Sequence, residues 1–145
     1  MREVLFRAKR LDNGEWVEGN LIFSNDAEEG WEAIIIPITN SNMFTKGETK
    51  GNLGFENWHM VDPKTVCQYT GMTDRNGKKI WENNIVQMFY RDGGTDTGTI
   101  RYTEQCARFQ YYEAGEIGYG IDITCDMEVI GDIFDNPELL KGGAE

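Results

Sequence analysis

The chain has 145 residues, of which 39% are hydrophobic and 12% aromatic, and its formal net charge is −11. This composition is typical of a folded globular protein and excludes a disordered one. The longest apolar run, residues 33–38, is far shorter than the roughly 20 residues that a membrane-spanning helix needs. The first ten residues also lack the apolar segment of a secretory signal. We therefore expect no membrane association.

The negative charge is concentrated toward the end of the chain. From Phe109 onward nine acidic residues face Lys141 alone, a net charge of −8. The simplest interpretation is a surface that keeps the protein in solution. The alternative is an acidic face that meets a basic partner or mimics nucleic acid. Either interpretation argues against non-specific binding to phosphates, which depends on positive charge.

The cysteines and the histidine indicate a reduced protein without a metal centre. Cys67, Cys106 and Cys125 lie far apart, form no CxxC pair and are odd in number, while His59 is the only histidine. Zinc sites need clustered ligands at short spacing. We predict free thiols and therefore a cytoplasmic protein, with no metal and no cofactor.

The first part of the chain predicts a succession of strands. Residues 4–10 alternate between two faces, and the turn residues Asp12-Asn13-Gly14 join them to a returning strand over residues 16–23. Residues 31–38 are apolar and rich in β-branched side chains, which predicts a buried strand. That strand must end or lie at an edge at Pro37, because proline has no amide donor.

A polar segment and a short helix follow. Residues 39–57 are rich in glycine and polar residues, which predicts a long loop. Asp62 before Pro63 is typical of a helix start, so we predict a short helix over residues 63–66.

The remainder of the chain predicts a small barrel. The sequence Asp74-Arg75-Asn76-Gly77 indicates a tight turn, and strand-like segments follow over residues 78–91, 99–113 and 119–134. Strands at this spacing are typical of small β-barrels. A short terminal helix is predicted from Pro137, with Asn136 as its cap.

Three segments of the sequence resemble one protein family. The letters FRAK at residues 6–9, VDPKTVCQYTGMTDRNGKKIWENNIV at residues 61–86 and VIGDIFDNPELL at residues 129–140 occur in the order found in the YopX-like family of phage and prophage proteins. The resemblance implies a phage or prophage origin and a β-rich protein of two lobes, the second an SH3-like barrel. It implies no reaction. The chain departs from the family pattern at Asn83-Asn84, where the family has Gly-Asp.

The predicted fold class is therefore mostly β (α+β) with short helices only. We expect an N-terminal β-rich lobe over residues 1–66, which includes the loop 39–57. A connecting corner is expected over residues 67–82. The SH3-like barrel and the terminal helix should occupy residues 83–145.

The central stretch also supplies the candidate binding residues. Four basic residues and one acid between Arg75 and Arg91 give a local charge of +3. A recognition loop for an anionic group is one interpretation. The other is structural: Tyr69 and Trp81 pack in the core, and Asp74 bonds to its own loop. The candidate binding residues are Gln68, Tyr69, Thr70, Asp74, Arg75, Lys78, Lys79, Arg91 and Tyr112.

Binding is the predicted function. The expected partner is a protein, or a second copy of this chain through an exposed strand edge. A nucleic-acid-binding module that uses the basic residues of segment 75–101, Arg101 included, is the alternative, and the net charge disfavours it. A small enzyme is a further alternative. The sequence lacks the common catalytic motifs and has one histidine, so we predict no catalytic residues.

Overall fold

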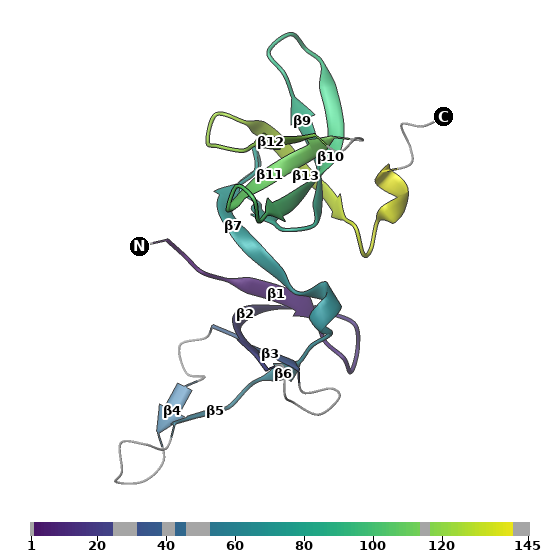
Figure 1. Ribbon diagram of the computed structural model, residues 1–145. Coiled ribbons are helices and arrows are strands. Elements are labelled where there is room, and N and C mark those ends of the chain that lie inside the picture. The colour runs from purple at the N-terminus through teal and green to yellow at the C-terminus, as the bar shows by residue number, and fades with distance from the viewer. Residues whose placement is uncertain (1, 25–31, 39–42, 46–52, 114–116, 141–145) are drawn as a thin grey trace. The chain divides into compact units, whose positions relative to one another are not determined.

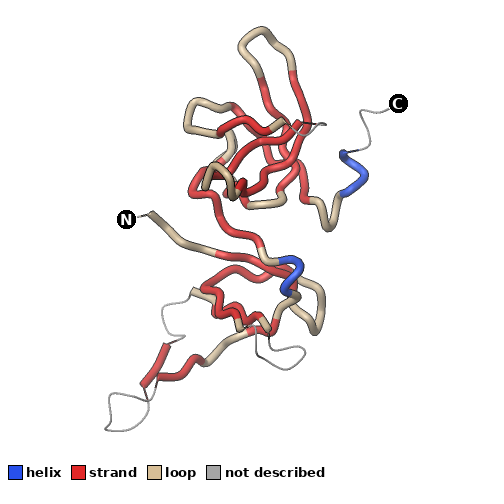
Figure 2. Tube along the Cα trace, in the orientation of Figure 1, coloured by secondary structure: helices blue, strands red, loops and turns tan. Residues whose placement is uncertain are grey.

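The computed structural model describes residues 2–24, 32–38, 43–45, 53–113 and 117–140. Within these residues the protein is mostly β, as predicted, and its helices are two short 3₁₀ turns (Figure 2). The strands, in chain order, are β1 (Phe6–Lys9), β2 (Trp16–Phe23), β3 (Ala33–Ile36), β4 (Met43–Thr45), β5 (Leu53–Phe55), β6 (His59–Met60), β7 (Cys67–Thr73), β8 (Lys79–Trp81), β9 (Asn84–Phe89), β10 (Thr95–Thr103), β11 (Arg108–Glu113), β12 (Gly118–Gly120) and β13 (Asp126–Asp132). The helices are η1 (Pro63–Thr65) and η2 (Pro137–Leu140).

The chain forms two compact units. The N-terminal unit is built from Glu3–Gln68, and the C-terminal unit begins at Tyr69. Strand β7 belongs to both, because Cys67 and Gln68 pair with β1 whereas its later residues pair with β8 (Figure 1). The segment 67–82 thus consists of two antiparallel strands and the turn between them.

A six-stranded antiparallel sheet has the order β6-β3-β2-β1-β7-β8, and its strands from β6 to the start of β7 lie in the N-terminal unit. The predicted hairpin is confirmed, since β1 and β2 pair around a turn in which Gly14 has a φ of 71°. Glycine adopts this left-handed conformation without the steric cost that a Cβ atom imposes. The buried core consists of Ala8, Ala33, Ile35 and Val61.

The segment 31–38 is the predicted buried strand. Strand β3 occupies Ala33–Ile36 and ends immediately before Pro37, as expected from the missing amide donor. Ile35 is fully buried. Ala33 and Ile36 are buried as well, in keeping with the continuous apolar run of the sequence.

The loop predicted over residues 39–57 is wrong in part. Strands β4 and β5 lie within it and pair with each other in antiparallel register, Met43 opposite Phe55. Pairing gives the facing backbone groups of these two short strands their hydrogen-bond partners. Residues 39–42 and 46–52 of the predicted loop lie outside the described residues.

Five antiparallel strands in the order β12-β11-β10-β9-β13 form the C-terminal unit. Its arrangement is SH3-like, and the core consists of Ile80, Val86, Met88, Ile100, Tyr111 and Met127. No ladder joins β12 to β13 among the described residues, so the barrel is open between these two edge strands.

Both short helices lie where the sequence places them. The Asp62 side chain accepts a hydrogen bond from the Lys64 amide at 3.0 Å and so caps η1. The cap predicted for η2 differs in its bonding. The Asn136 backbone carbonyl accepts from the Leu139 amide at 3.1 Å, whereas its side-chain oxygen accepts from the Asp132 amide at 3.2 Å.

Candidate functional site

The Asp74 carboxylate organises the turn between β7 and β8. One oxygen accepts hydrogen bonds from the amides of Asn76 and Lys78, both at 2.9 Å, and the other accepts from the Val129 amide at 2.9 Å. Burial by itself raises the pKa of Asp74. The three backbone donors and the Lys78 charge outweigh burial, so the pKa lies below its ordinary value of 3.8. Asp74 is thus a structural residue whose oxygens are already occupied.

The residues after Asp74 hold the turn against β13. The Arg75 guanidinium pairs with Asp126, with 3.1 Å between Nε and Oδ1, and lies 4.0 Å from the centre of the Phe89 ring. The Asn76 amide group donates to Glu128 at 3.3 Å. Arg75 is therefore engaged by an acid and an aromatic ring, which weakens its case as a ligand for an anionic group.

Structural contacts also occupy the residues before the turn. Tyr69 is buried and its ring centre lies 5.5 Å from that of Trp81. The Thr70 hydroxyl donates to the Ile80 carbonyl at 2.8 Å. Gln68 is half-buried and pairs with Phe6 of β1. The packing predicted for Tyr69 and Trp81 is present.

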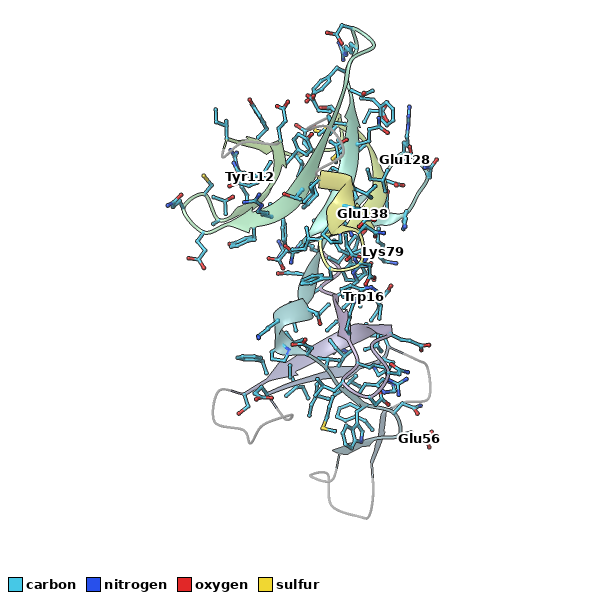
Figure 3. The ribbon with its side chains drawn as sticks, turned by 90° about the vertical axis from the view of Figure 1, so that its right-hand side faces the viewer. Trp16, Glu56, Lys79, Tyr112, Glu128 and Glu138 are labelled. Carbon is cyan, nitrogen blue, oxygen red and sulfur yellow. The ribbon has the colours of Figure 1, made fainter. Side chains whose placement is uncertain are left out.

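The remaining candidate residues fall in different surroundings. Lys79 on β8 lies 5.7 Å from the Tyr69 ring centre, and Lys78 is exposed beside it in the turn. Tyr112 on β11 faces away from Tyr111, and its ring is 4.7 Å from the Arg101 guanidinium (Tyr112 and Lys79 are labelled in Figure 3). Arg91 lines a separate pocket. The structure thus does not gather the nine candidates into one site.

That pocket lies in the C-terminal unit and has a volume of about 480 Å³. We call it the tyrosine pocket. Its walls come from β9, β11 and β12 and from the chain that leads into β13. Its lining residues are Met88, Phe89, Tyr90, Arg91, Tyr111, Glu113, Tyr119, Gly120, Thr124, Cys125 and Asp126. Four of these side chains are aromatic, which is typical of binding pockets.

Negative charge surrounds the tyrosines of this pocket. Burial raises the pKa of Tyr90 to about 12, helped by its hydrogen bond to Asp96 and by the charges of Asp96, Glu113 and Tyr119. Burial also raises the pKa of Tyr111, with the charges of Tyr90, Asp96 and Glu113 adding to it. The Tyr111 hydroxyl is buried without a hydrogen-bond partner among the described residues. Both phenols are neutral at physiological pH, and the carboxylates of Asp96 and Glu113 lie near them.

Comparisons with known proteins identify the family. A sequence model described as YopX protein matches residues 5–141. The chain belongs to the YopX family. None of the curated proteins matches it. Among solved structures, the crystal structure of protein EF1440 from Enterococcus faecalis is 22% identical, with a TM-score of 0.61 over 97% of this chain and 99% of that chain. At this identity the likeness to the solved structure shows a shared fold. The family model confirms the resemblance found in the sequence.

The two asparagines that replace the Gly-Asp of the YopX pattern serve the same turn. Asn83 has a φ of 67°, in the left-handed region that glycine favours and asparagine tolerates. Asn84 is buried, and its side-chain oxygen accepts from the Trp81 amide at 2.8 Å. A carboxylate could accept the same bond, so position 84 has a structural role that does not require an acid.

Sequence reasoning missed most of the tyrosine pocket. Of its lining residues only Arg91 was a candidate binding residue, because the others come from four separate segments of this YopX-family chain. The signal available in the sequence was the high density of tyrosine from Tyr102 to Tyr119 in an acidic segment. That signal indicated exposed rings without showing which of them converge.

His59 lies in the other unit and has a different environment. It lines a hollow of about 210 Å³ together with Arg10, Leu11, Asp12, Trp58 and Met60. Burial and the charge of Arg10 lower the pKa of His59, against the opposite effect of Asp12. Arg10 itself pairs with Asp12 at 2.6 Å. No described cysteine lines this hollow, so His59 has no thiol nucleophile beside it there.

The described residues give no sign of a metal site or of a membrane-spanning helix. They contain no group of three or more histidine, cysteine, aspartate or glutamate side chains arranged to hold a metal ion. Neither of their helices has the length and apolar character needed to cross a membrane.

Proposed function

We propose that this YopX-family protein acts by binding a protein partner through the tyrosine pocket and the adjoining edge strand β12. The observation that carries the proposal is the pocket itself, in which four aromatic side chains surround a hollow of about 480 Å³. Tyrosine and other aromatic residues supply much of the energy of protein interfaces, because they bury a large area with few rotatable bonds.

Exposed apolar residues beside the pocket support a protein partner. Ile117 precedes β12 and Tyr119 lies within it, and both side chains are exposed. Ile123, which follows β12, is 93% exposed. Strand β12 pairs with β11 on one side, and the described residues supply no strand on its other side. Such an edge can accept an added strand from another chain, whose side chains then reach the adjacent pocket.

The biological setting we propose is that of a phage or prophage accessory protein in the cytoplasm of a bacterial host. Cys67, Cys106 and Cys125 are free, in keeping with a reducing compartment. A similar fold occurs in a protein of Enterococcus faecalis. In this proposal the protein acts by binding its partner, and no catalytic step is assigned to it.

Affinity capture tests the proposal. The immobilised protein is exposed to host lysate, with and without nuclease, in parallel with two single variants. Tyr119→Ala removes an exposed ring from the pocket, whereas Tyr102→Ala removes an exposed ring that contacts Phe109 outside it. We expect one protein to be retained by the original chain and by Tyr102→Ala, and lost at least tenfold with Tyr119→Ala.

Other outcomes point elsewhere. Equal retention by both variants would contradict the pocket as the binding surface. Material that disappears with nuclease would favour the nucleic-acid alternative. Self-association is checked by light scattering on the purified chain, since a dimer that Tyr119→Ala dissociates would make a second copy the partner.

A further inference from the structure

We infer that the tyrosine pocket receives a cationic side chain, a lysine or arginine of the bound partner. The inference rests on the proposed function, because it specifies the chemistry of the partner at the same pocket. It draws on the aromatic walls, on the acidic groups around them, and on the cations that neighbouring rings already hold.

Aromatic faces of this unit already bind cations. The Arg75 guanidinium lies 4.0 Å from the centre of the Phe89 ring, and Phe89 also lines the pocket. On β11, the Arg101 guanidinium lies 4.7 Å from the centre of the Tyr112 ring. A cation over an aromatic face is attracted by the ring quadrupole, and several rings around one space strengthen the attraction. Tyr90, Tyr111 and Tyr119 supply such rings within the pocket.

The carboxylates give the pocket its preference for positive charge. Glu113 lines it and makes no ion pair with any described residue. Asp126 also lines it, with its charge partly neutralised by Arg75. Asp96 accepts the hydrogen bond of the Tyr90 hydroxyl and adds a further negative charge nearby. A lysine or arginine that enters this space would meet both acid and aromatic faces, the combination that binds ammonium and guanidinium groups.

Among the described lining residues Arg91 is the one that is basic, and it does not reverse this preference. It is exposed at the turn between β9 and β10, where water and salt screen its charge. Glu113 is half-buried and is screened less. The carboxylates of Glu113 and Asp126 line the pocket beside the tyrosines, and Asp96 lies within hydrogen-bond reach of Tyr90.

A titration followed by nuclear magnetic resonance tests the inference without knowledge of the partner. The probes are N-acetyl-lysine methylamide, N-acetyl-arginine methylamide and the neutral N-acetyl-norleucine methylamide, at constant ionic strength. We expect either cationic probe to shift the resonances of Tyr90, Tyr111 and Gly120 with an affinity at least tenfold above that of the neutral probe. The amides of Ala33 and Val61 in the other unit serve as reference signals.

Two variants show whether the acid of the pocket is responsible. Glu113→Gln keeps the size of the side chain and removes its charge, so it should lower the affinity for the cationic probes at least fivefold and leave the neutral probe unaffected. Glu104→Gln is the matched control, because it removes an exposed charge from the turn between β10 and β11. Equal losses in both variants would overturn the assignment to Glu113 and reduce the effect to net charge.

The rates of thiol modification test the same inference without any substitution. Cys125 lines the pocket and Cys106 is exposed elsewhere. Trimethylammonioethyl methanethiosulfonate and neutral methyl methanethiosulfonate modify both, and peptide mass mapping separates the two rates. We expect the ratio of cationic to neutral rate to be at least tenfold higher at Cys125 than at Cys106. Equal ratios would overturn the inference.

Different measurements would overturn the cationic occupant and the proposed function. Equal affinity for cationic and neutral probes, or no shift with any probe, overturns the cationic occupant. The pocket still binds a partner if capture depends on Tyr119. Capture that does not depend on Tyr119 overturns the proposed function itself, whichever probe binds.

Discussion

At the scale of single residues, Asp74 explains why the central stretch is so polar and yet structural. Its carboxylate accepts hydrogen bonds from three backbone amides. Two of these amides belong to the turn, and the third lies 55 positions away on β13. Buried amides left without acceptors cost free energy, so the demand for an acceptor at position 74 is strict. The turn chemistry was predicted because it is local, whereas the bond to Val129 was not.

Substitution at Asp74 separates the local bonds from the distant one. Asp74→Ala leaves three amides without their acceptor, and we expect the free energy of unfolding to fall by about 3 kcal/mol. Asp74→Asn keeps one oxygen for Asn76 and Lys78 and loses only the acceptor for Val129, so it should cost about half as much. Urea denaturation measures both. Equal losses would show that the bonds to Asn76 and Lys78 contribute nothing, and an unchanged Asp74→Asn would show that the bond to Val129 contributes nothing.

The ionisation of Asp74 should make the free energy of unfolding depend on pH. The pKa of Asp74 is lower in the folded protein than its ordinary value of 3.8, so its ionised form stabilises the fold. The contribution is complete above pH 3.8 and is lost as the pH falls through the folded-state pKa. The difference in unfolding free energy between the original chain and Asp74→Asn should therefore shrink as the pH falls below 3.8. A difference that stays constant from pH 7 to pH 2 would contradict this origin.

At the scale of elements, the pairing of β10 with β11 depends on a close approach at Gly98. A Cβ atom there would lie 2.3 Å from the Tyr112 carbonyl oxygen and 2.6 Å from Cε2 of Tyr111. Gly98 therefore makes room for the ring that forms part of the tyrosine pocket.

Gly98→Ala should reduce stability by about 3 kcal/mol, since the added methyl group must displace backbone or a buried ring. Thr97→Ala is the control, because it removes atoms from the neighbouring position of the same strand and should change stability by less than about 1 kcal/mol. Thermal unfolding followed by near-ultraviolet circular dichroism measures both. A Gly98→Ala protein as stable as Thr97→Ala would show that the strands can separate at little cost.

The strands also show how far the sequence alone could lead. Alternation and turn residues predicted β1 and β2, and a run of apolar β-branched residues predicted β3, because these signals lie within a few positions of each other. Strands β4 and β5 were missed because each has three residues within a polar segment. The pairing of Arg75 with Asp126, 51 positions apart, and the convergence of Tyr90, Tyr111 and Tyr119 depend on tertiary register. A single sequence carries no direct signal for such contacts.

At the scale of the whole molecule, each unit has a hydrophobic core of its own. Ile35 and Val61 lie in the core of the N-terminal unit, and Ile100 and Met127 in that of the C-terminal unit. Strand β7 is the element that contributes residues to both. Separate cores permit separate opening, in which one unit exchanges its amide hydrogens while the other stays folded.

Two matched core variants test this independence. Ile100→Val and Ile35→Val each remove one methylene group from a fully buried side chain, at a cost of about 1 kcal/mol. We expect Ile100→Val to accelerate amide exchange in β9, β10 and β11 about fivefold and to leave β2 and β3 unchanged, with Ile35→Val giving the reverse pattern. Acceleration of both units by either variant would mean that the continuous strand β7 couples them into one cooperative structure. Exchange confined to the altered unit would mean that partner binding at the tyrosine pocket stabilises the C-terminal unit alone, because all the described residues that line the pocket belong to that unit.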